Sequence, residues 1–361
     1  MLDALMGRAK KECIGLDISS SSVKLLELSR SKSGQYRVES YANEPLPPGA
    51  VSEKKIVDPN MVGEAIGKAA DKAGVRTKQT ALAMSGAAVI TKIIQLPAGL
   101  SDHEMEEQIK AEADQYVPYK IEEVNIDFQV RGPVAGDDKM VDVLLAASRK
   151  EEIEQRCAAI EIAGLTPYVV DVETYALENA CELLRHQMPD QGEQKTIAIV
   201  DVGGTNTSVA ILHNLETVFT REQPFGGKQL VEDVMRKYGQ SHDEAMRNIK
   251  QGQLPEDYES EVLAHFISDM IQQIDRNLQF FFSASSQYTN VDLILLAGGC
   301  AHIANIENAV SDKLKLPAAM VRPLANMSVA SRARPQTLAK EEAGLLICCG
   351  LALRAFDPPR A

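Results

Sequence analysis

The stretch IGLDISSSSVKLLELS (Ile14 to Ser29) has a counterpart farther along the chain, TIAIVDVGGTNTSVAILHN (Thr196 to Asn214). Each consists of an apolar run that reaches an aspartate, a turn of Gly, Ser or Thr residues, and a second apolar run. This pattern predicts two strands joined by a tight turn. The sequence therefore indicates two similar hairpins, with Asp17 and Asp201 at equivalent positions.

Two hairpins of this kind that face each other are suited to binding the phosphates of a nucleotide. Small side chains let backbone N–H groups approach anionic oxygens, and an aspartate at each turn can hold Mg²⁺ through its water shell. The alternative for either aspartate alone is a turn residue satisfied by local backbone N–H groups. The paired context favours nucleotide binding, although the chain contains no GxxxxGK motif.

The composition excludes several other classes of protein. The chain has 361 residues, 45% hydrophobic and 25% charged, which predicts a soluble protein of two to three domains. Its net charge of -13 argues against nucleic acid as a partner, because phosphate contacts need clustered Lys and Arg. The six cysteines show no CxxC spacing, and the six histidines show no metal-binding or nucleophile-partner spacing. We therefore expect reduced thiols and no zinc site.

No segment of the sequence is predicted to cross a membrane. The N-terminal MLDALMGRAKKE lacks the apolar core of a signal peptide, so a cytoplasmic location is expected. The apolar run from Ala343 to Leu353 is shorter than the roughly 20 residues that a spanning helix needs, and we interpret it as a buried helix. Residues 1–11 could form an amphipathic helix with weak membrane contact, but a frayed terminus is the simpler interpretation.

The region between the hairpins reads as a third strand and a helix, followed by a separate α+β unit. Gln79 to Pro97 predicts two strands interrupted at Ser85 and Gly86. Then follow a helix with a capping box at Ser101 and Glu104, two strands and a second helix. The predicted segments are a strand at 35–47, a helix at 60–72, a helix at 101–117, strands at 124–130 and 141–149, and a helix at 150–163. Residues 87 to 170 thus predict a small module inserted into a larger α/β domain.

After the second hairpin the pattern predicts a long helix, a buried strand and a last helix. These segments are 261–282, 291–300 and 337–356, and a connecting helix at 171–186 precedes the hairpin. The buried strand runs into Gly298 and Gly299, where the lack of Cβ would let a purine or ribose lie against the backbone. A tight packing turn is the alternative for this pair, but its place after two matched hairpins favours nucleotide.

The order and spacing of these three turns resemble those of the actin, Hsp70 and sugar-kinase superfamily. Within it the chain most closely resembles the PilM family of type IV pilus assembly proteins, relatives of the division protein FtsA. The runs that carry this resemblance are DISSSSVKLLELS, YANEPLP, QYVPYKIEEVNIDFQV, GGKQL and RNLQFF, between about residues 12 and 356. The module at 87–170 stands where FtsA and PilM carry subdomain 1C.

The resemblance implies an actin-like (ribonuclease H-like) α/β fold of two lobes with an inserted FtsA-type module. The implied boundaries are 1–13 for an N-terminal segment, 14–86 and 171–190 for the first lobe, 87–170 for the module, and 191–336 for the second lobe with an insertion at about 229–288. The last helix, 337–356, is expected to pack back on the first lobe.

The resemblance also implies the residues of an ATP and magnesium site. Phosphate would be met by Asp17, Ser20, Ser21, Ser22 and Lys24 from one side and by Asp201, Gly203, Gly204, Thr205 and Asn206 from the other. The adenosine would lie near Gly298, Gly299 and Arg276, the ribose near Gly226, Gly227 and Lys228, and Mg²⁺ near Asp17 and Asp201. Asp201 and Glu173 would take part in any hydrolysis, Glu173 by positioning water; a structural carboxylate is the alternative. Ser19 and Ser21 depart from the family pattern, in which glycines are commoner at these positions.

The function implied by the resemblance is that of a cytoplasmic adaptor with at most weak ATPase activity. In the PilM family the protein binds the cytoplasmic N-terminal tail of PilN in a groove bounded by the first lobe and the module, which makes it peripheral to the inner membrane. The resemblance thereby implies a link between other pilus inner-membrane proteins and cytoplasmic motor proteins. Two alternatives are an FtsA-like filament protein and a small-molecule kinase of the same superfamily. The chain ends at Ala361 without the basic amphipathic helix expected of a filament tether.

Overall fold

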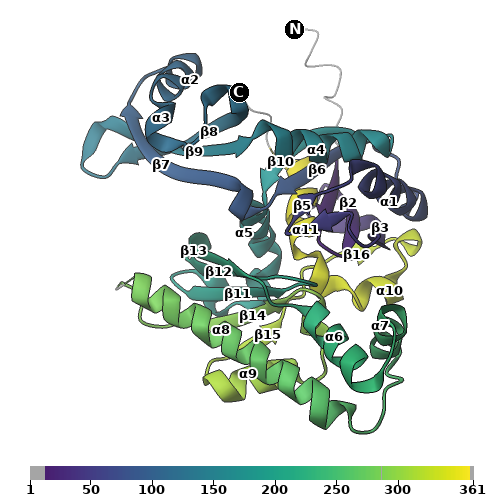
Figure 1. The fold of residues 1–361 in the computed structure, drawn as a ribbon. Coiled ribbons are helices and arrows are strands. Elements are labelled where there is room, and N and C mark those ends of the chain that lie inside the picture. Colours follow the sequence, from purple (N-terminus) through teal and green to yellow (C-terminus); the bar gives the residue numbers. More distant parts are fainter. Residues whose placement is uncertain (1–12, 286, 358–361) are drawn as a thin grey trace.

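A computed structural model describes residues 13–285 and 287–357, and most of this part of the chain is arranged around three sheets (Figure 1). The largest has the strand order β10-β6-β1-β2-β3-β16. Its strands are β1 (Ile14–Ile18), β2 (Ser22–Arg30), β3 (Tyr36–Pro45), β6 (Gln79–Met84), β10 (Thr166–Val172) and β16 (Ser328–Val329). Helices α1 (Pro59–Ala73) and α4 (Lys150–Ile162) pack on one face, and α5 (Glu173–Leu184) and α11 (Leu346–Leu353) pack on the other. We call this unit the first lobe.

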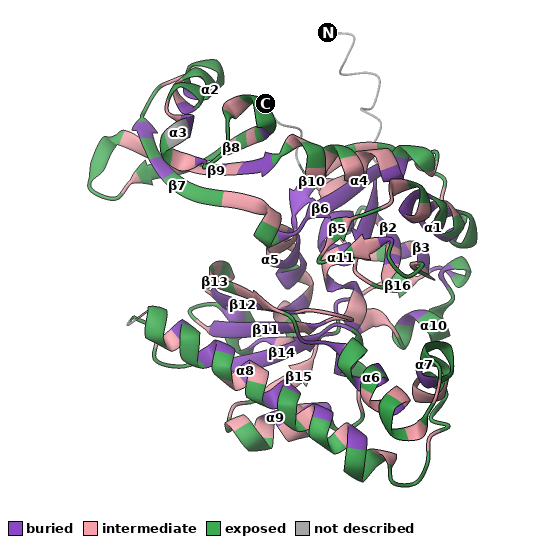
Figure 2. Cartoon of the chain, viewed as in Figure 1, coloured by how far each residue is buried: buried purple, intermediate pink, exposed green. Residues whose placement is uncertain are grey.

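The second lobe is built on a five-stranded sheet with the order β13-β12-β11-β14-β15. Its strands are β11 (Thr196–Val202), β12 (Thr207–His213), β13 (Glu216–Gln223), β14 (Leu293–Ala297) and β15 (Ala318–Met320). Its helices are α6 (Gly227–Tyr238), α7 (His242–Gln251), α8 (Ala264–Ala284) and α9 (Ile306–Leu314). Strands β11 and β14 are buried along their whole length except for partly exposed Asp201, because they lie inside the sheet and helices cover both faces (Figure 2).

The module projects from the first lobe on the side away from α1 (Figure 1). Its three strands, in the order β7-β9-β8, are β7 (Val89–Pro97), β9 (Asp137–Arg149) and β8 (Val124–Val134). Helices α2 (Asp102–Ala111) and α3 (Ala113–Tyr116) accompany this sheet, and Met105 and Ile109 of α2 form a small core with strand residues. Strand β9 continues into α4 without an intervening loop. The module is therefore joined directly to a helix of the first lobe.

Most of the elements predicted from the sequence are confirmed. In the first hairpin Asp17 pairs with Lys24, and in the second Asp201 pairs with Ser208, both in antiparallel register. The predicted capping box at Ser101 is formed, and the structure has a second one at Ser241. The third strand, the helix near 60–72, the break near Ser85 and the module strands are all present. The N-terminal segment lies outside the described residues apart from its last residue, Cys13.

Two predicted helices are interrupted, and two strands cross the predicted boundaries. The helix after Ser101 breaks at Glu112, whose carboxylate accepts a hydrogen bond from Tyr116. The last helix is divided into α10 (Pro335–Ala339), a short 3-10 turn and α11, and within that turn the Ala343 carbonyl accepts a hydrogen bond from the N–H of Gly298. Strand β10 begins inside the predicted module, and β16 pairs with β3 although the predicted second lobe extends to residue 336.

The C-terminal helix α11 is buried, as predicted for the apolar run from Ala343 to Leu353, and it packs unusually close to its neighbours. A Cβ on Gly350 would lie 1.7 Å from the Ala176 carbonyl oxygen of α5, and a Cβ on Gly15 would lie 2.3 Å from the Cys348 oxygen. Both positions therefore require glycine. Within the described residues, no helix has the length and hydropathy needed to span a bilayer.

Candidate nucleotide site

The first hairpin places a lysine and an aspartate beside each other at its turn end. Lys24 Nζ lies 2.9 Å from Asp17 Oδ2, and the aspartate side chain is only 8% exposed. Burial alone would lower the pKa of Lys24, but the negative charge of Asp17, reinforced by Asp201, raises it above its usual range. Lys24 is therefore a charged donor held at the base of the turn.

The two hairpin turns lie against each other between the lobes. A Cβ on Gly204 would lie 3.0 Å from Ser21 Oγ and 3.5 Å from Ser20 Oγ, so the serine turn and the glycine turn are neighbours. In the part of the chain that the structure describes, the N–H groups of Ser20, Ser21, Gly204 and Thr205 have no hydrogen-bond acceptor. Unpaired backbone donors at tight turns are the usual partners of phosphate oxygens.

The second turn is positioned by the first turn of α6. The N–H of Gly227 donates to the Gly203 carbonyl at 2.9 Å, and the N–H of Lys228 donates to Gly204 at 2.7 Å. A Cβ on Gly226 would approach the Gly203 oxygen to 2.6 Å, so only glycine permits this contact. Gly226 and Gly227 therefore shape the turn of the second hairpin.

Gly298 and Gly299 occupy very different surroundings. Gly298 has a φ of 86° and is buried against Asp201: a Cβ there would lie 2.4 Å from Asp201 Oδ1. Gly299 is exposed, and a Cβ on it would meet nothing within 4 Å. The backbone at Gly299 is thus accessible to a flat ligand, whereas Gly298 is required for packing.

Glu173 and Asp201 contribute carboxylates from opposite lobes. Glu173 lies at the start of α5 and accepts a hydrogen bond from Lys54 Nζ at 2.7 Å. Burial raises the pKa of Glu173, and Lys54 opposes this increase. Burial also raises the pKa of Asp201, against the opposing charges of Lys24 and Lys54. The two acids therefore lie within the electrostatic reach of the same lysine.

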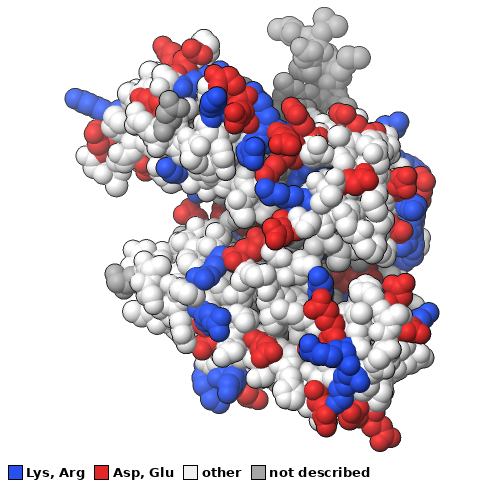
Figure 3. Space-filling view, viewed as in Figure 1, with Lys and Arg blue, Asp and Glu red and all other residues white. Residues whose placement is uncertain are grey.

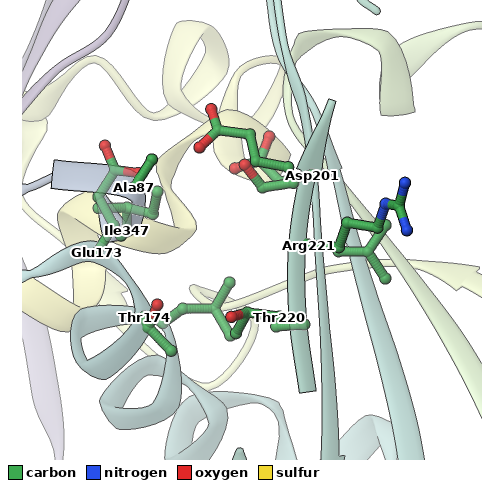
Figure 4. Close-up of a pocket in the computed structure, with 13 residues that line it drawn as sticks. Ala87, Glu173, Thr174, Asp201, Thr220, Arg221 and Ile347 are labelled. Carbon is green, nitrogen blue, oxygen red and sulfur yellow. The ribbon is translucent and has the colours of Figure 1, made fainter. Parts of the chain in front are cut away.

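A cavity of about 220 Å³ separates these two carboxylates (Figure 4). Glu173 and Thr174 approach it from the first lobe, and Asp201 and Thr220 approach it from the second, whereas Arg221 points away. The other lining residues are Gly86, Ala87, Leu177, Ser208, Val209, Ala210, Glu222 and Ile347. Figure 3 shows a larger hollow between the module and the second lobe, bordered by acidic and basic side chains.

Four further predicted site residues lie outside the pairs described above, and three of them make local hydrogen bonds in this region. Arg276 is exposed on α8, and Lys228 is 63% exposed and paired with Glu232, although its N–H donates to the second turn. Ser22 accepts a hydrogen bond at its carbonyl from Ser19 Oγ, which stabilises the first turn. Asn206 donates from Nδ2 to Glu222 at 2.9 Å. The roles predicted for these residues remain predictions.

No sequence pattern predicted that Lys54, Glu222 and Arg156 lie at the candidate site. Lys54 and Arg156 are separated by about a hundred positions and belong to no recognisable motif. Lys54 lies in a hairpin of β4 (Val51–Ser52) and β5 (Lys55–Ile56), and it contacts both Glu173 and Glu222. A two-residue turn with charged residues is a weak signal, so only the fold brings these side chains to the site.

The residues present are compatible with a nucleotide but do not form a metal site alone. Free N–H donors, Lys24 and the exposed backbone of Gly299 suit phosphates and a base. Among the described residues, no three His, Cys, Asp or Glu side chains are close enough together to hold a metal ion. Mg²⁺ bound here would depend on phosphate oxygens and water for most of its ligands, as is usual for this ion.

The fold and the paired turns define an actin-like protein. A crystal structure of the ethanolamine utilization protein EutJ from Carboxydothermus hydrogenoformans shares this fold, with a TM-score of 0.51 and 15% identity over 95% of this chain and 89% of that chain. A family model described as type IV pilus assembly protein PilM matches residues 15–356, so the chain belongs to the PilM family. A solved PilM-PilN type IV pilus biogenesis complex is similar over 96% of this chain and 99% of that one, with a TM-score of 0.77 and 26% identity.

Proposed function

We propose that this protein binds ATP with Mg²⁺ between its two hairpin turns and acts as an adaptor in type IV pilus assembly. The observation that supports nucleotide binding most directly is the pair of neighbouring turns with unpaired N–H groups, at Ser20, Ser21, Gly204 and Thr205, within the described residues. The Lys24 ammonium contributes a positive charge to the phosphates. Asp17 and Asp201 hold Mg²⁺ through its water shell, and the adenosine lies against Gly299.

In this proposal the nucleotide stabilises a conformation more than it is turned over. Glu173, the candidate for positioning water, is held by Lys54 at 2.7 Å. A carboxylate already paired with an ammonium is a weak general base. Slow attack of water on the γ-phosphate is therefore the only reaction that we expect. The protein is peripheral to the inner membrane through its partner.

Thermal melting tests the nucleotide site. Mg-ATP is expected to raise the melting temperature of the wild type but not that of Asp17→Asn combined with Asp201→Asn, because a ligand that binds only the folded state stabilises it. Asp243→Asn is a suitable control, since the side chain of Asp243 is 98% exposed on α7. Equal shifts in all three proteins would show that the phosphates bind elsewhere.

The partner that we propose is the cytoplasmic N-terminal tail of PilN, bound beside β10 in the groove between the first lobe and the module. Strand β10 is at the edge of the first sheet, where an extended peptide can add as a further strand. Val170 on β10 is 41% exposed and Ile162 on α4 is 47% exposed, which provides apolar surface next to this edge. The similarity to the solved PilM-PilN complex supports this partner.

A pull-down with the tail peptide, with and without Mg-ATP, tests the adaptor role. Wild type and Asp201→Asn should be compared, together with Val170→Asp, which should lose binding while retaining its fold. Val57→Asp is the matched control, because Val57 is 61% exposed but lies outside β10. Absence of tail binding by the wild type under both conditions would exclude the adaptor role, and ATP consumption stimulated by one metabolite would indicate a kinase instead.

A further inference from the structure

The hairpin of β4 and β5 has a strained turn that carries a buried charge. Its two turn residues, Glu53 and Lys54, have φ values of 48° and 62°, a left-handed conformation that favours Asn and Gly. Strained backbone of this kind persists only where surrounding contacts determine it. We therefore expect the contacts of Lys54 to hold the turn in this conformation.

Lys54 joins the two lobes through its side chain. Its Nζ lies 2.7 Å from Glu173 Oε2 in the first lobe and 2.9 Å from Glu222 Oε1 in the second, and the lysine side chain is 17% exposed. The same Glu222 oxygen accepts a hydrogen bond from Asn206 Nδ2 of the second phosphate turn. One ammonium group thus links α5, β13 and, through Glu222, the glycine turn.

The backbone of the same hairpin is attached to α4. Arg156, a residue of α4 that is only 4% exposed, donates from Nη2 to the Lys54 carbonyl at 2.7 Å. Next to it, Lys55 Nζ pairs with Glu152 of α4 at 2.9 Å. Because β9 runs directly into α4, the module is joined without a loop to the helix that holds the Lys54 hairpin.

We propose that Lys54 is a positioning residue that latches the two lobes together and that Arg156 couples this latch to the module. A partner that shifts the module changes the position of the hairpin, and with it the contacts of Lys54 with Glu173 and Glu222. The spacing of the two phosphate turns then changes, because Glu222 also holds Asn206. The consequence for nucleotide rests on the proposed function, but the latch itself is a property of the nucleotide-free protein.

Distances between the lobes test the latch directly. Spin labels on cysteines at Lys68 of α1 and Arg247 of α7, both exposed, report one position in each lobe (Figure 1). The background is Cys157→Ser, because the other native cysteines are buried. Without nucleotide, Lys54→Met is expected to shift the distance distribution to longer values and to broaden it. Lys32→Met, at an exposed position, should leave the distribution unchanged.

Glu222→Gln tests the same latch from the second lobe and should shift the distribution in the same direction. A folded Lys54→Met protein with wild-type distances would overturn the latch. Coupling to α4 is tested by Arg156→Met, with Arg156→Lys as a milder variant should the first fail to fold. The Arg156 variant should open the lobes, and combining it with Lys54→Met should add nothing, because both act through one contact.

The coupling to the module would be overturned if the Arg156 variant kept the wild-type distances. It would also be overturned if the changes in distance caused by the Arg156 variant and by Lys54→Met were fully additive. These measurements need no nucleotide, so they do not depend on the ATP site. Failure of Mg-ATP to raise the melting temperature of the wild type would instead count against the proposed function and leave the latch intact. The two conclusions can therefore fail separately.

Discussion

Lys24 and Asp17 face each other across the first hairpin, with the lysine Nζ 2.9 Å from the aspartate Oδ2. The two residues are partners in the antiparallel ladder, so the hairpin itself determines their distance. In the nucleotide-free protein the aspartate balances the lysine charge that we assign to phosphate. Nucleotide binding would therefore exchange one partner of Lys24 for another, which makes the pair a measurable link between stability and binding.

Removing this lysine should destabilise the nucleotide-free protein. Lys24→Met leaves Asp17 buried without its partner, which we expect to lower the free energy of unfolding by about 2 kcal/mol. Urea denaturation measures this change. Lys32→Met, which alters an exposed lysine, should change stability by less than about 0.5 kcal/mol. Equal effects of the two substitutions would mean that the ion pair does not stabilise the fold.

Replacing Asp201 should stabilise the protein at neutral pH. Burial raises the pKa of Asp201 above 3.8, so the folded state binds its proton more tightly than the unfolded state. The ionised form thus costs stability above the folded pKa, and this cost disappears as the pH falls toward 3.8. Asp201→Asn should melt at a higher temperature than the wild type at neutral pH, and the difference should shrink in acidic buffer. A difference in melting temperature that does not change with pH would contradict this explanation.

Gly298→Ala should lower stability, whereas Gly299→Ala should lower the affinity for ATP. A Cβ on Gly298 would lie 2.4 Å from Asp201 Oδ1 at a φ of 86°, so we expect a loss of stability of about 3 kcal/mol. The space around Gly299 is open, so its alanine variant should fold with nearly unchanged stability but bind ATP more weakly. Denaturation and ATP titration distinguish the two. Unchanged ATP affinity in Gly299→Ala would place the adenosine elsewhere.

The contact between α11 and α5 should be intolerant of a single methyl group. In Gly350→Ala the added Cβ would lie 1.7 Å from the Ala176 oxygen, so the helices must separate, and we expect a loss of about 3 kcal/mol. Gly67→Ala is the matched control within α1, where nothing lies within 4 Å and a gain of up to about 1 kcal/mol is expected. Similar melting temperatures for both variants would refute the close approach.

Local sequence patterns were sufficient for most of the fold. Alternating and continuous apolar runs predicted the strands of both hairpins, and the capping box at Ser101 marked the start of α2. Local patterns did not predict the interruptions of the last helix and of the helix after Ser101. At the first of these, the Ala343 carbonyl accepts a hydrogen bond from the N–H of Gly298 in the second lobe, a contact that no local pattern encodes.

The candidate site likewise contains residues that local patterns predicted and residues that they did not. The family resemblance of the first hairpin implied the role of Lys24. The two aspartates and the turn residues were predicted because each hairpin carries its pattern within one short segment. No pattern predicted Lys54, Arg156 and Glu222, because a charged residue and a partner distant in sequence leave no local signal. The contacts of Lys54 with Glu173 and Glu222 require two lobes and a hairpin to meet.

By itself, the sequence determined the presence of two matched aspartate hairpins, the module between them and the family to which they point. Each hairpin is encoded by side-chain periodicity and turn chemistry over fewer than about twenty consecutive residues. The module and the family follow from the order of several such segments along the chain. The tertiary structure alone decided which charges meet: Lys24 with Asp17, and Lys54 with one carboxylate from each lobe. The physical reason is that electrostatic interactions depend on distance in space and on burial, and neither is written in the order of residues along the chain.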